Sequence, residues 1–160
     1  MDESLLRRAA LRRLLPPRER EKNGEGVALK VVVQSCCGPE KVYGLVARMA
    51  ARLLAEQLRP DKVLFVCLPR LAHGDEETKK LVEENPCITI DGCVNRCAKN
   101  IVEQAGGKPM VSITVVDVLK ENRHLMPRAQ QLMKLDEKGV KLAEKVAERL
   151  AVEVDYLLGE

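Results

Sequence analysis

The stretch VALKVVVQS at residues 27–35, followed at once by CCGP at residues 36–39, decides the fold of this 160-residue chain. It is rich in β-branched residues and almost continuously apolar, which is typical of a strand that is buried on both faces. Strands of this kind belong to parallel sheets that are covered by helices on both sides. The stretch therefore predicts an α/β fold whose first strand spans residues 27–35.

The sequence beyond this strand alternates between helical and strand patterns. Apolar residues at helical spacing predict helices over residues 41–58, 76–84 and 94–105. Apolar runs predict further strands over residues 62–68, 87–91 and 110–116. This alternation predicts a three-layer, doubly wound fold with a mainly parallel four-stranded sheet and flanking helices.

The two ends of the chain carry further helical patterns. Residues 1–26 are expected to form an amphipathic helix, over residues 4–15, and a polar connector, and residues 27–160 to form a single α/β domain. We expect the N-terminal helix to dock on the domain, although a membrane surface, a protein partner or a second copy of the chain could also use it. Near the C-terminus, helices are predicted over residues 127–134 and 136–152, with Asp136 as the N-cap of the second.

Composition excludes several classes of protein. The net charge of +3 is small beside 27 basic and 24 acidic residues, and two tyrosines, one phenylalanine and no tryptophan leave few rings for stacking on bases. Nucleic acid is therefore not an expected partner. No apolar run approaches the roughly 18 residues that a transmembrane helix needs, and the first residues lack the apolar core of a secretory signal. We expect a cytoplasmic protein without a transmembrane segment, in which thiols stay reduced.

Five of the six cysteines lie where predicted strands end. Cys36 and Cys37 follow the first strand, Cys67 belongs to the end of the second, and Cys93 follows the third, with Cys97 four residues later. Ligands of open α/β sheets bind at the carboxyl ends of the strands, so these thiols are expected to converge at one edge of the sheet. The sixth cysteine, Cys87, starts the third strand and is expected to be a buried core residue at the opposite edge.

The segment DGCVNRC at residues 91–97 is the most specific part of this pattern. Gly92 permits a sharp turn from strand to helix, which would place Cys93 at the N-terminus of the helix over residues 94–105. Cys97 would then lie on the same helical face, with its β-carbon about 5–6 Å from that of Cys93. A helix N-terminus stabilises a thiolate, and Arg96 and Lys99 would strengthen this effect if they face the site.

Clustered thiols that stay reduced are more typical of a metal site than of disulfides. Structural zinc takes four nitrogen or sulfur ligands, whereas three ligands with an open position allow transfer or catalysis. Consecutive strand residues point to opposite faces, so we expect only one of Cys36 and Cys37 to coordinate, and we favour Cys37 because flexible Gly38 follows it. Cys67, Cys93 and Cys97 complete the candidate set.

Other polar residues near these turns have weaker claims to a role. His73 lies in the loop after the second strand and is expected to be solvated, although it could be a ligand, and His124 has a weaker claim still. Asp91 is expected to brace its turn by accepting bonds from backbone amides, with the orientation of metal ligands as the alternative. Asp117 follows the fourth strand at the same edge and carries the same two interpretations.

The motif IDGC at residues 90–93, the following Cys97, the Cys37-Gly38 turn and the strand-end Cys67 resemble the DGC-domain family, to which zinc binding is ascribed. The resemblance runs from about residue 31 to residue 117. It implies an α/β domain and cysteine-bound zinc, with Cys37, Cys67, Cys93 and Cys97 as ligands, and it implies no established reaction.

Three functions are therefore compared. The leading hypothesis is a zinc-binding protein that uses a thiolate cluster in a structural, carrier or sensing role. One alternative is a thiol enzyme for sulfur transfer, group transfer or redox chemistry, with Cys93 as the nucleophile and Cys97 or Cys37 as the resolving thiol. Another is an iron–sulfur protein that uses the same cysteines. Nucleotide binding is not expected, because no glycine-rich phosphate-binding motif follows the first strand.

Overall fold

The computed structural model of the chain describes residues 29–38, 41–131 and 134–160. The predicted N-terminal helix over residues 4–15 and the connector up to residue 26 lie outside these described residues.

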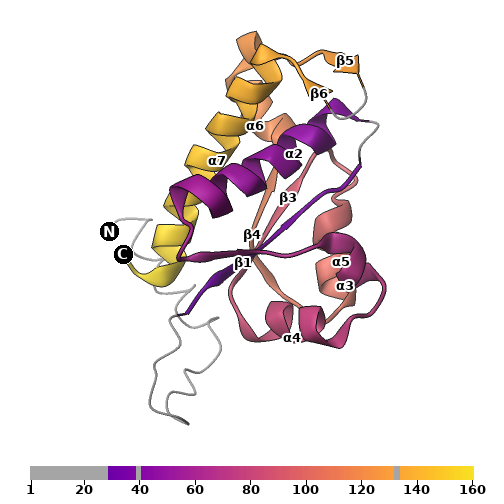
Figure 1. Cartoon of the computed structure of the whole chain (residues 1–160), viewed down its shortest axis with the longest axis vertical. Helices are drawn as coiled ribbons and strands as arrows, with labels where there is room; N and C mark the ends of the chain where they lie inside the picture. The colour runs from indigo at the N-terminus through magenta and orange to yellow at the C-terminus, as the bar shows by residue number, and fades with distance from the viewer. Residues whose placement is uncertain (1–28, 39–40, 132–133) are drawn as a thin grey trace, which may run out of the picture.

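Four parallel strands form the central sheet in the order β2-β1-β3-β4 (Figure 1). Their bounds are β1 (Val31–Ser35), β2 (Val63–Phe65), β3 (Cys87–Asp91) and β4 (Pro109–Thr114). Every residue of β1 and β3 is buried, as expected for strands covered on both faces. The predicted fold class is confirmed, although β1 begins later and β2 ends earlier than the apolar runs that predicted them.

Helices cover both faces of the sheet, which makes three layers (Figure 1). One face is covered by α2 (Val42–Leu53), its π-helical continuation η1 (Leu54–Leu58), α6 (Val115–Glu121) and α7 (Glu137–Leu158). The other face is covered by α3 (Leu68–Ala72), α4 (Glu76–Glu84) and α5 (Cys97–Gln104). The short remaining elements are the 3-10 turn η2 (Arg123–Leu125) and an antiparallel pair, β5 (Ala129–Gln131) and β6 (Lys134–Leu135).

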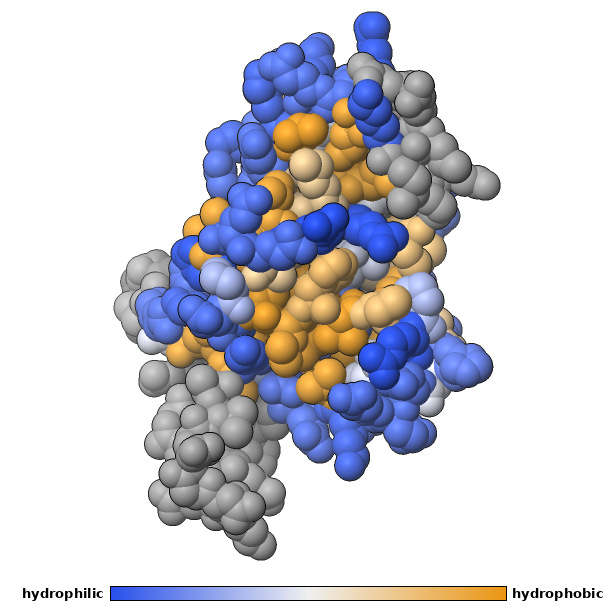
Figure 2. Space-filling model, in the orientation of Figure 1, coloured by the Kyte–Doolittle hydropathy of each residue, from blue (hydrophilic) through white to orange (hydrophobic). Residues whose placement is uncertain are grey.

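The alternation of side chains along β1 divides the core into two parts. Val31 and Val33 face α2 and α7, whereas Val32 packs with residues of α3, α4 and α5. Helix α7 contributes a stripe at helical spacing to the larger part, through Leu142, Ala143, Val146, Ala147, Leu150 and Val154, all of them fully buried. Burial of these apolar side chains is the main favourable term in holding the layers together. On the face of the molecule drawn in Figure 2, some apolar residues remain visible between the hydrophilic ones.

The predicted N-cap of α7 is confirmed. The carboxylate of Asp136 accepts a hydrogen bond of 2.8 Å from the backbone N–H of Gly139. The helix predicted over residues 127–134 is wrong, because this segment contains β5 and the first residue of β6. The two short strands satisfy each other's backbone groups, and the backbone N–H of Arg128 donates to Asp136 at 3.1 Å instead of starting a helix.

The helix predicted over residues 94–105 begins three residues later than expected, at Cys97. Arg96 adopts a left-handed backbone conformation with φ of 49°, which interrupts any helical path from residue 94. Helices α3 and α6 were not predicted, because each is short and begins within a range predicted as a strand. None of the helices in the described part of the chain is long and apolar enough to span a membrane.

The connections change direction between β1 and β3. The chain leaves β1 through α2 on one face of the sheet to reach β2, and leaves β3 through α5 on the other face to reach β4. The carboxyl ends of β1 and β3 therefore form the topological switch point, where open α/β sheets usually bind their ligands.

Candidate functional site

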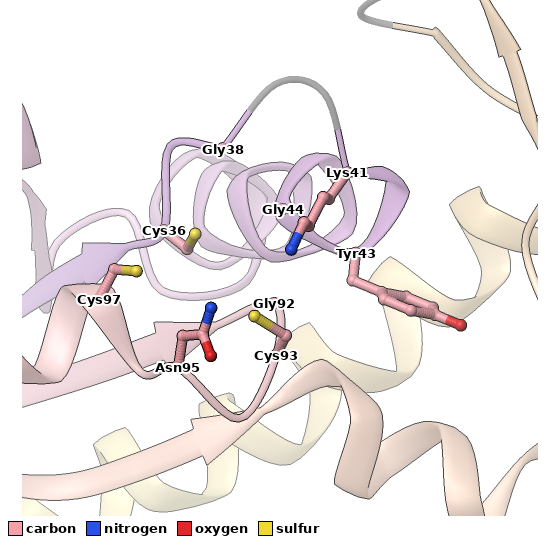
Figure 3. A pocket seen from close by; sticks show the side chains of 9 residues that line it. All are labelled: Cys36, Gly38, Lys41, Tyr43, Gly44, Gly92, Cys93, Asn95 and Cys97. Atoms are coloured by element: carbon pink, nitrogen blue, oxygen red, sulfur yellow. The ribbon is translucent and has the colours of Figure 1, made fainter.

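A pocket of about 280 Å³ opens at this switch point (Figure 3). Its walls come from the end of β1, the start of α2, the turn between β3 and α5, and the first residue of α5. The described residues that line it are Cys36, Gly38, Lys41, Tyr43, Gly44, Gly92, Cys93, Asn95 and Cys97.

Three thiols share this pocket. Figure 3 shows the side chains of Cys36, Cys93 and Cys97 turned toward the same space from three different segments. The backbone N–H of Cys36 donates to the carbonyl of Ile90 at 2.8 Å, so the pairing of β1 with β3 continues one residue past β1. This bond fixes Cys36 beside the end of β3, and thus beside the turn that carries Cys93.

The turn at residues 92–96 lies directly against the backbone of α2 because Gly92 has no side chain. A β-carbon at Gly92 would stand 2.8 Å from both the backbone N of Gly44 and the carbonyl carbon of Tyr43. A β-carbon at Gly44 would in turn overlap the carbonyl oxygen of Gly38. The sequence predicts that Gly92 permits a sharp turn of the chain. The φ of Gly92 is not positive, however, and the turn requires glycine because its backbone lies so close to the backbone of α2.

Asp91 braces this turn, as predicted. Its side chain is 1% exposed and accepts hydrogen bonds from the backbone N–H groups of Ala98 at 2.7 Å and Lys99 at 3.2 Å. These two donors belong to the first turn of α5, where helical N–H groups have no partner within the helix. Burial raises the pKa of Asp91, and the two amide bonds act in the opposite direction. The bonds set the position of Cys97, which begins the helix.

The expected arrangement of Cys93 and Cys97 on one helical face is wrong. Cys93 lies in the turn before α5, and its carbonyl accepts a hydrogen bond of 3.2 Å from the backbone N–H of Arg96. The left-handed Arg96 follows and redirects the chain into Cys97. Both thiols nevertheless line the same pocket, because the tight turn brings residue 93 back toward the start of the helix.

The thiols of the pocket influence one another electrostatically. Burial raises the pKa of Cys97, and the negative charges of Cys36, Asp91 and Cys93 raise it further. The thiolate of Cys97 is therefore harder to form when Cys36 or Cys93 already carries a negative charge. A cation bound among them would reverse the sign of this effect, because a metal ion favours the deprotonated form of its thiol ligands.

Cys37 and Cys67 lie outside the pocket, and both are exposed. Burial and the charge of neighbouring Cys36 raise the pKa of Cys37, Cys67 adds a smaller effect of the same sign, and Arg48 lowers it. Cys67 is the residue just before α3. Of the five candidate thiols, the structure thus brings three around one pocket and leaves two beside it at the same edge of the sheet.

Within the described residues, no three histidine, cysteine, aspartate or glutamate side chains already stand where they could hold one metal ion. His73 is an exposed residue at the end of α3, and His124 lies in η2. Neither histidine lines the pocket.

The remaining candidates are engaged elsewhere. Asp117 lies in the first turn of α6, where it accepts bonds from Thr114 at 2.6 Å and Lys120 at 2.8 Å. Arg96 donates to Ser112 at 3.3 Å, and Lys99 pairs with Glu103 at 3.6 Å, so neither cation faces the pocket. Cys87 is fully buried as predicted, and burial raises its pKa to about 12.

Four residues that line the pocket were missed by the sequence analysis, namely Lys41, Tyr43, Gly44 and Asn95. Gly44 carried a signal, because a glycine inside a helix weakens the helix unless close packing requires it. Tyr43 is held by its hydroxyl, which donates to the sulfur of Met126 at 3.5 Å. Lys41 and Asn95 gave no signal in the sequence, because their positions follow from how α2 and the turn pack together.

The fold and the site define an α/β protein with a thiol-lined pocket at the switch point of its sheet. The family model of the DGC domain matches residues 32–139, which is more than half of the chain, and the chain therefore belongs to the DGC-domain family. Comparison with curated proteins and with solved structures found no match.

Proposed function

We propose that this protein binds zinc through cysteine thiolates at the carboxyl edge of the sheet, in a structural, carrier or sensing role. The observation that supports the proposal best is the shared pocket of Cys36, Cys93 and Cys97. Membership of the DGC-domain family fits a metal-binding role. The proposal includes a cytoplasmic location, where thiols remain available for a metal.

The donor set suits zinc. Three sulfur donors in one pocket match the preference of zinc for cysteine ligands, and thiolate donors disfavour magnesium and calcium, which bind oxygen. The negative charges of Cys36 and Cys93 raise the pKa of Cys97, and a cation bound among the three sulfurs would offset this repulsion. Because the described side chains do not already stand at coordinating positions, zinc binding requires the three thiols to close on the ion.

The two exposed thiols are candidates for the remaining ligand. Cys37 is adjacent to Cys36 in the chain, and the charge of Cys67 reaches Cys37. A fourth cysteine from this pair would give a closed, structural site, whereas three pocket cysteines alone would leave a position open for exchange or transfer. The sequence favoured Cys37 over Cys36 as the ligand. We propose instead that Cys36, which lines the pocket, is one of the three pocket ligands, and that Cys37, which lies beside the pocket, is a candidate for the fourth.

Metal analysis of the full chain, purified without added metal, tests the proposal. Near-stoichiometric zinc in a colourless protein would support it. Brown protein that contains iron would favour an iron–sulfur centre instead. Metal-free protein in which Cys93 reacts with an alkylating reagent far faster than the other thiols would favour a thiol enzyme.

Single cysteine-to-serine variants then identify the ligands. Serine at position 36, 93 or 97 should weaken zinc binding by more than the roughly 10- to 100-fold that loss of a group supporting a ligand costs. Competition with a chromophoric chelator measures this change. Cys87→Ala is the matched control, because Cys87 is buried at the opposite edge of the sheet and should leave zinc binding unchanged. Unchanged zinc affinity in all three pocket variants would disprove the ligand assignment.

A further inference from the structure

The pocket is larger than a metal ion needs. Its volume is about 280 Å³, whereas one water molecule occupies about 30 Å³ in the liquid. Space for a molecule of several non-hydrogen atoms therefore remains beside the three thiols.

Lys41 gives this space a positive charge. Its amino group points into the pocket (Figure 3), and its side chain has no hydrogen-bond or ion-pair partner among the described residues. None of the described residues that line the pocket is acidic. A lysine in this position is suited to pair with an anionic group of a ligand.

Two further features favour an anion in the same space. The carboxamide of Asn95 is turned toward the pocket and can donate hydrogen bonds. Helix α2 begins beside the pocket, with no side-chain cap at Lys41 and no acidic residue in its first turn. The partial positive charge of this helix end is therefore not neutralised by the described residues, and it adds to the charge of Lys41.

We infer that the pocket binds a small thiol that carries a carboxylate. The inference rests on the proposed zinc function, because three cysteine ligands leave one position of a tetrahedral zinc ion for an external sulfur ligand. Lys41 and Asn95 hold the carboxylate of this ligand. A thiol without a carboxylate forms only the contact between sulfur and zinc, and a carboxylate without a thiol forms only the contact with Lys41 and Asn95.

Calorimetric titration of the zinc-loaded full chain with three probes tests this inference. Mercaptoacetate carries both groups, 2-mercaptoethanol carries only the thiol, and acetate carries only the carboxylate. Mercaptoacetate should bind most tightly. Lys41→Gln should weaken mercaptoacetate binding about two- to fivefold, the effect of losing one exposed charge contact, and leave 2-mercaptoethanol binding unchanged.

Two matched variants control for general effects of charge. Lys41→Arg keeps the positive charge and should retain most of the affinity for mercaptoacetate. Lys145→Gln removes a lysine on α7 that pairs with Glu148 at 2.8 Å, and should bind all three probes like the unchanged chain. The side chain of Lys41 makes no cap bond to α2, so its replacement should not disturb folding.

The outcomes separate this inference from the proposed function. A chain that takes up zinc but binds mercaptoacetate no better than 2-mercaptoethanol refutes the inference and leaves the zinc proposal standing. The same holds if Lys41→Gln keeps full affinity, or if mercaptoacetate merely removes zinc from the chain, which metal analysis of the protein after the titration detects. A chain that takes up no zinc refutes both.

Discussion

The contact between Gly92 and α2 makes the substitution Gly92→Ala a direct test of how the pocket is built. The added β-carbon would lie 2.8 Å from two backbone atoms and 3.0 Å from a third, the carbonyl oxygen of Tyr43. Carbon atoms prefer separations of about 3.5–4.0 Å, so the turn or the helix must move by about 0.7 Å or more. Backbone atoms on both sides cannot rotate away as a side chain could.

We expect this movement to cost about 1–3 kcal/mol of unfolding free energy, the usual range for overpacking a well-packed site. This range is the net effect of such substitutions, so it already includes the reduced freedom of alanine in the unfolded chain. With a urea dependence of about 2 kcal/mol per molar, the midpoint of unfolding should fall by about 0.5–1.5 M.

Urea denaturation of the metal-free chain, followed by circular dichroism, measures this shift without depending on zinc. Gly38→Ala is the control, because among the described residues its β-carbon would meet only the sulfur of Cys36, at 3.7 Å. That variant should be neutral or slightly more stable. A Gly92→Ala chain whose stability changes by less than about 0.5 kcal/mol, the usual effect of an unconstrained surface substitution, would refute the close approach of the two backbones.

Three further predictions concern stability. Burial raises the pKa of Cys87 to about 12 from an ordinary value of 9.0, so its contribution to stability is complete below pH 9.0 and is lost as the pH rises toward 12. Between about pH 8 and pH 10, the unchanged chain should therefore lose more stability than Cys87→Ala, by up to about 1.4 kcal/mol. Equal losses in the two chains would contradict this prediction. Hydrogen bonds from Arg59 are the main cause that lowers the pKa of Asp155 from 3.8 to about 2, so this contribution is present above pH 3.8 and is lost as the pH falls toward 2. Asp155→Asn should lower the free energy of unfolding by about 1 kcal/mol in urea denaturation near neutral pH, a value reduced for solvent exposure. The difference from the unchanged chain should disappear near pH 2, and a constant difference at all pH values would exclude this explanation. Asp91→Asn replaces one of two accepting oxygens at the start of α5 and should cost about 1–3 kcal/mol in the same assay, whereas unchanged stability would mean that the two amide bonds contribute little.

The parts of the fold that the sequence predicted well depend on local pattern. The bounds of α4 and β3 match their predicted ranges, and Asp136 caps α7 as expected. In each case hydrophobic periodicity and turn or cap chemistry indicate the same element. The segment over residues 127–134 shows the limit, because β5 and β6 depend on pairing with each other, which helical spacing cannot reveal.

The site was predictable only to the level of the sheet edge. Parallel topology places Cys36 and Cys93 at neighbouring strand ends, as the strand pattern indicated. The backbone bond from Cys36 to Ile90, however, depends on the register between β1 and β3, and the left-handed Arg96 depends on the packing of the turn. These tertiary features decide which thiols share the pocket, and they could not be derived from spacing.

The pairing of β1 with β3 also affects how the protein must mature. Cys36 and Cys93 are separated by more than fifty residues of sequence, and β2 with its helices is synthesised between them. Contacts between such distant segments form late in folding, because closing a long loop costs entropy before any contact compensates for it. A nascent chain therefore exposes dispersed thiols that can form incorrect disulfides, and only the completed sheet gathers them at one rim. Oxidation of Cys87, which is buried once the sheet is complete, should consequently be limited to chains that have not yet folded.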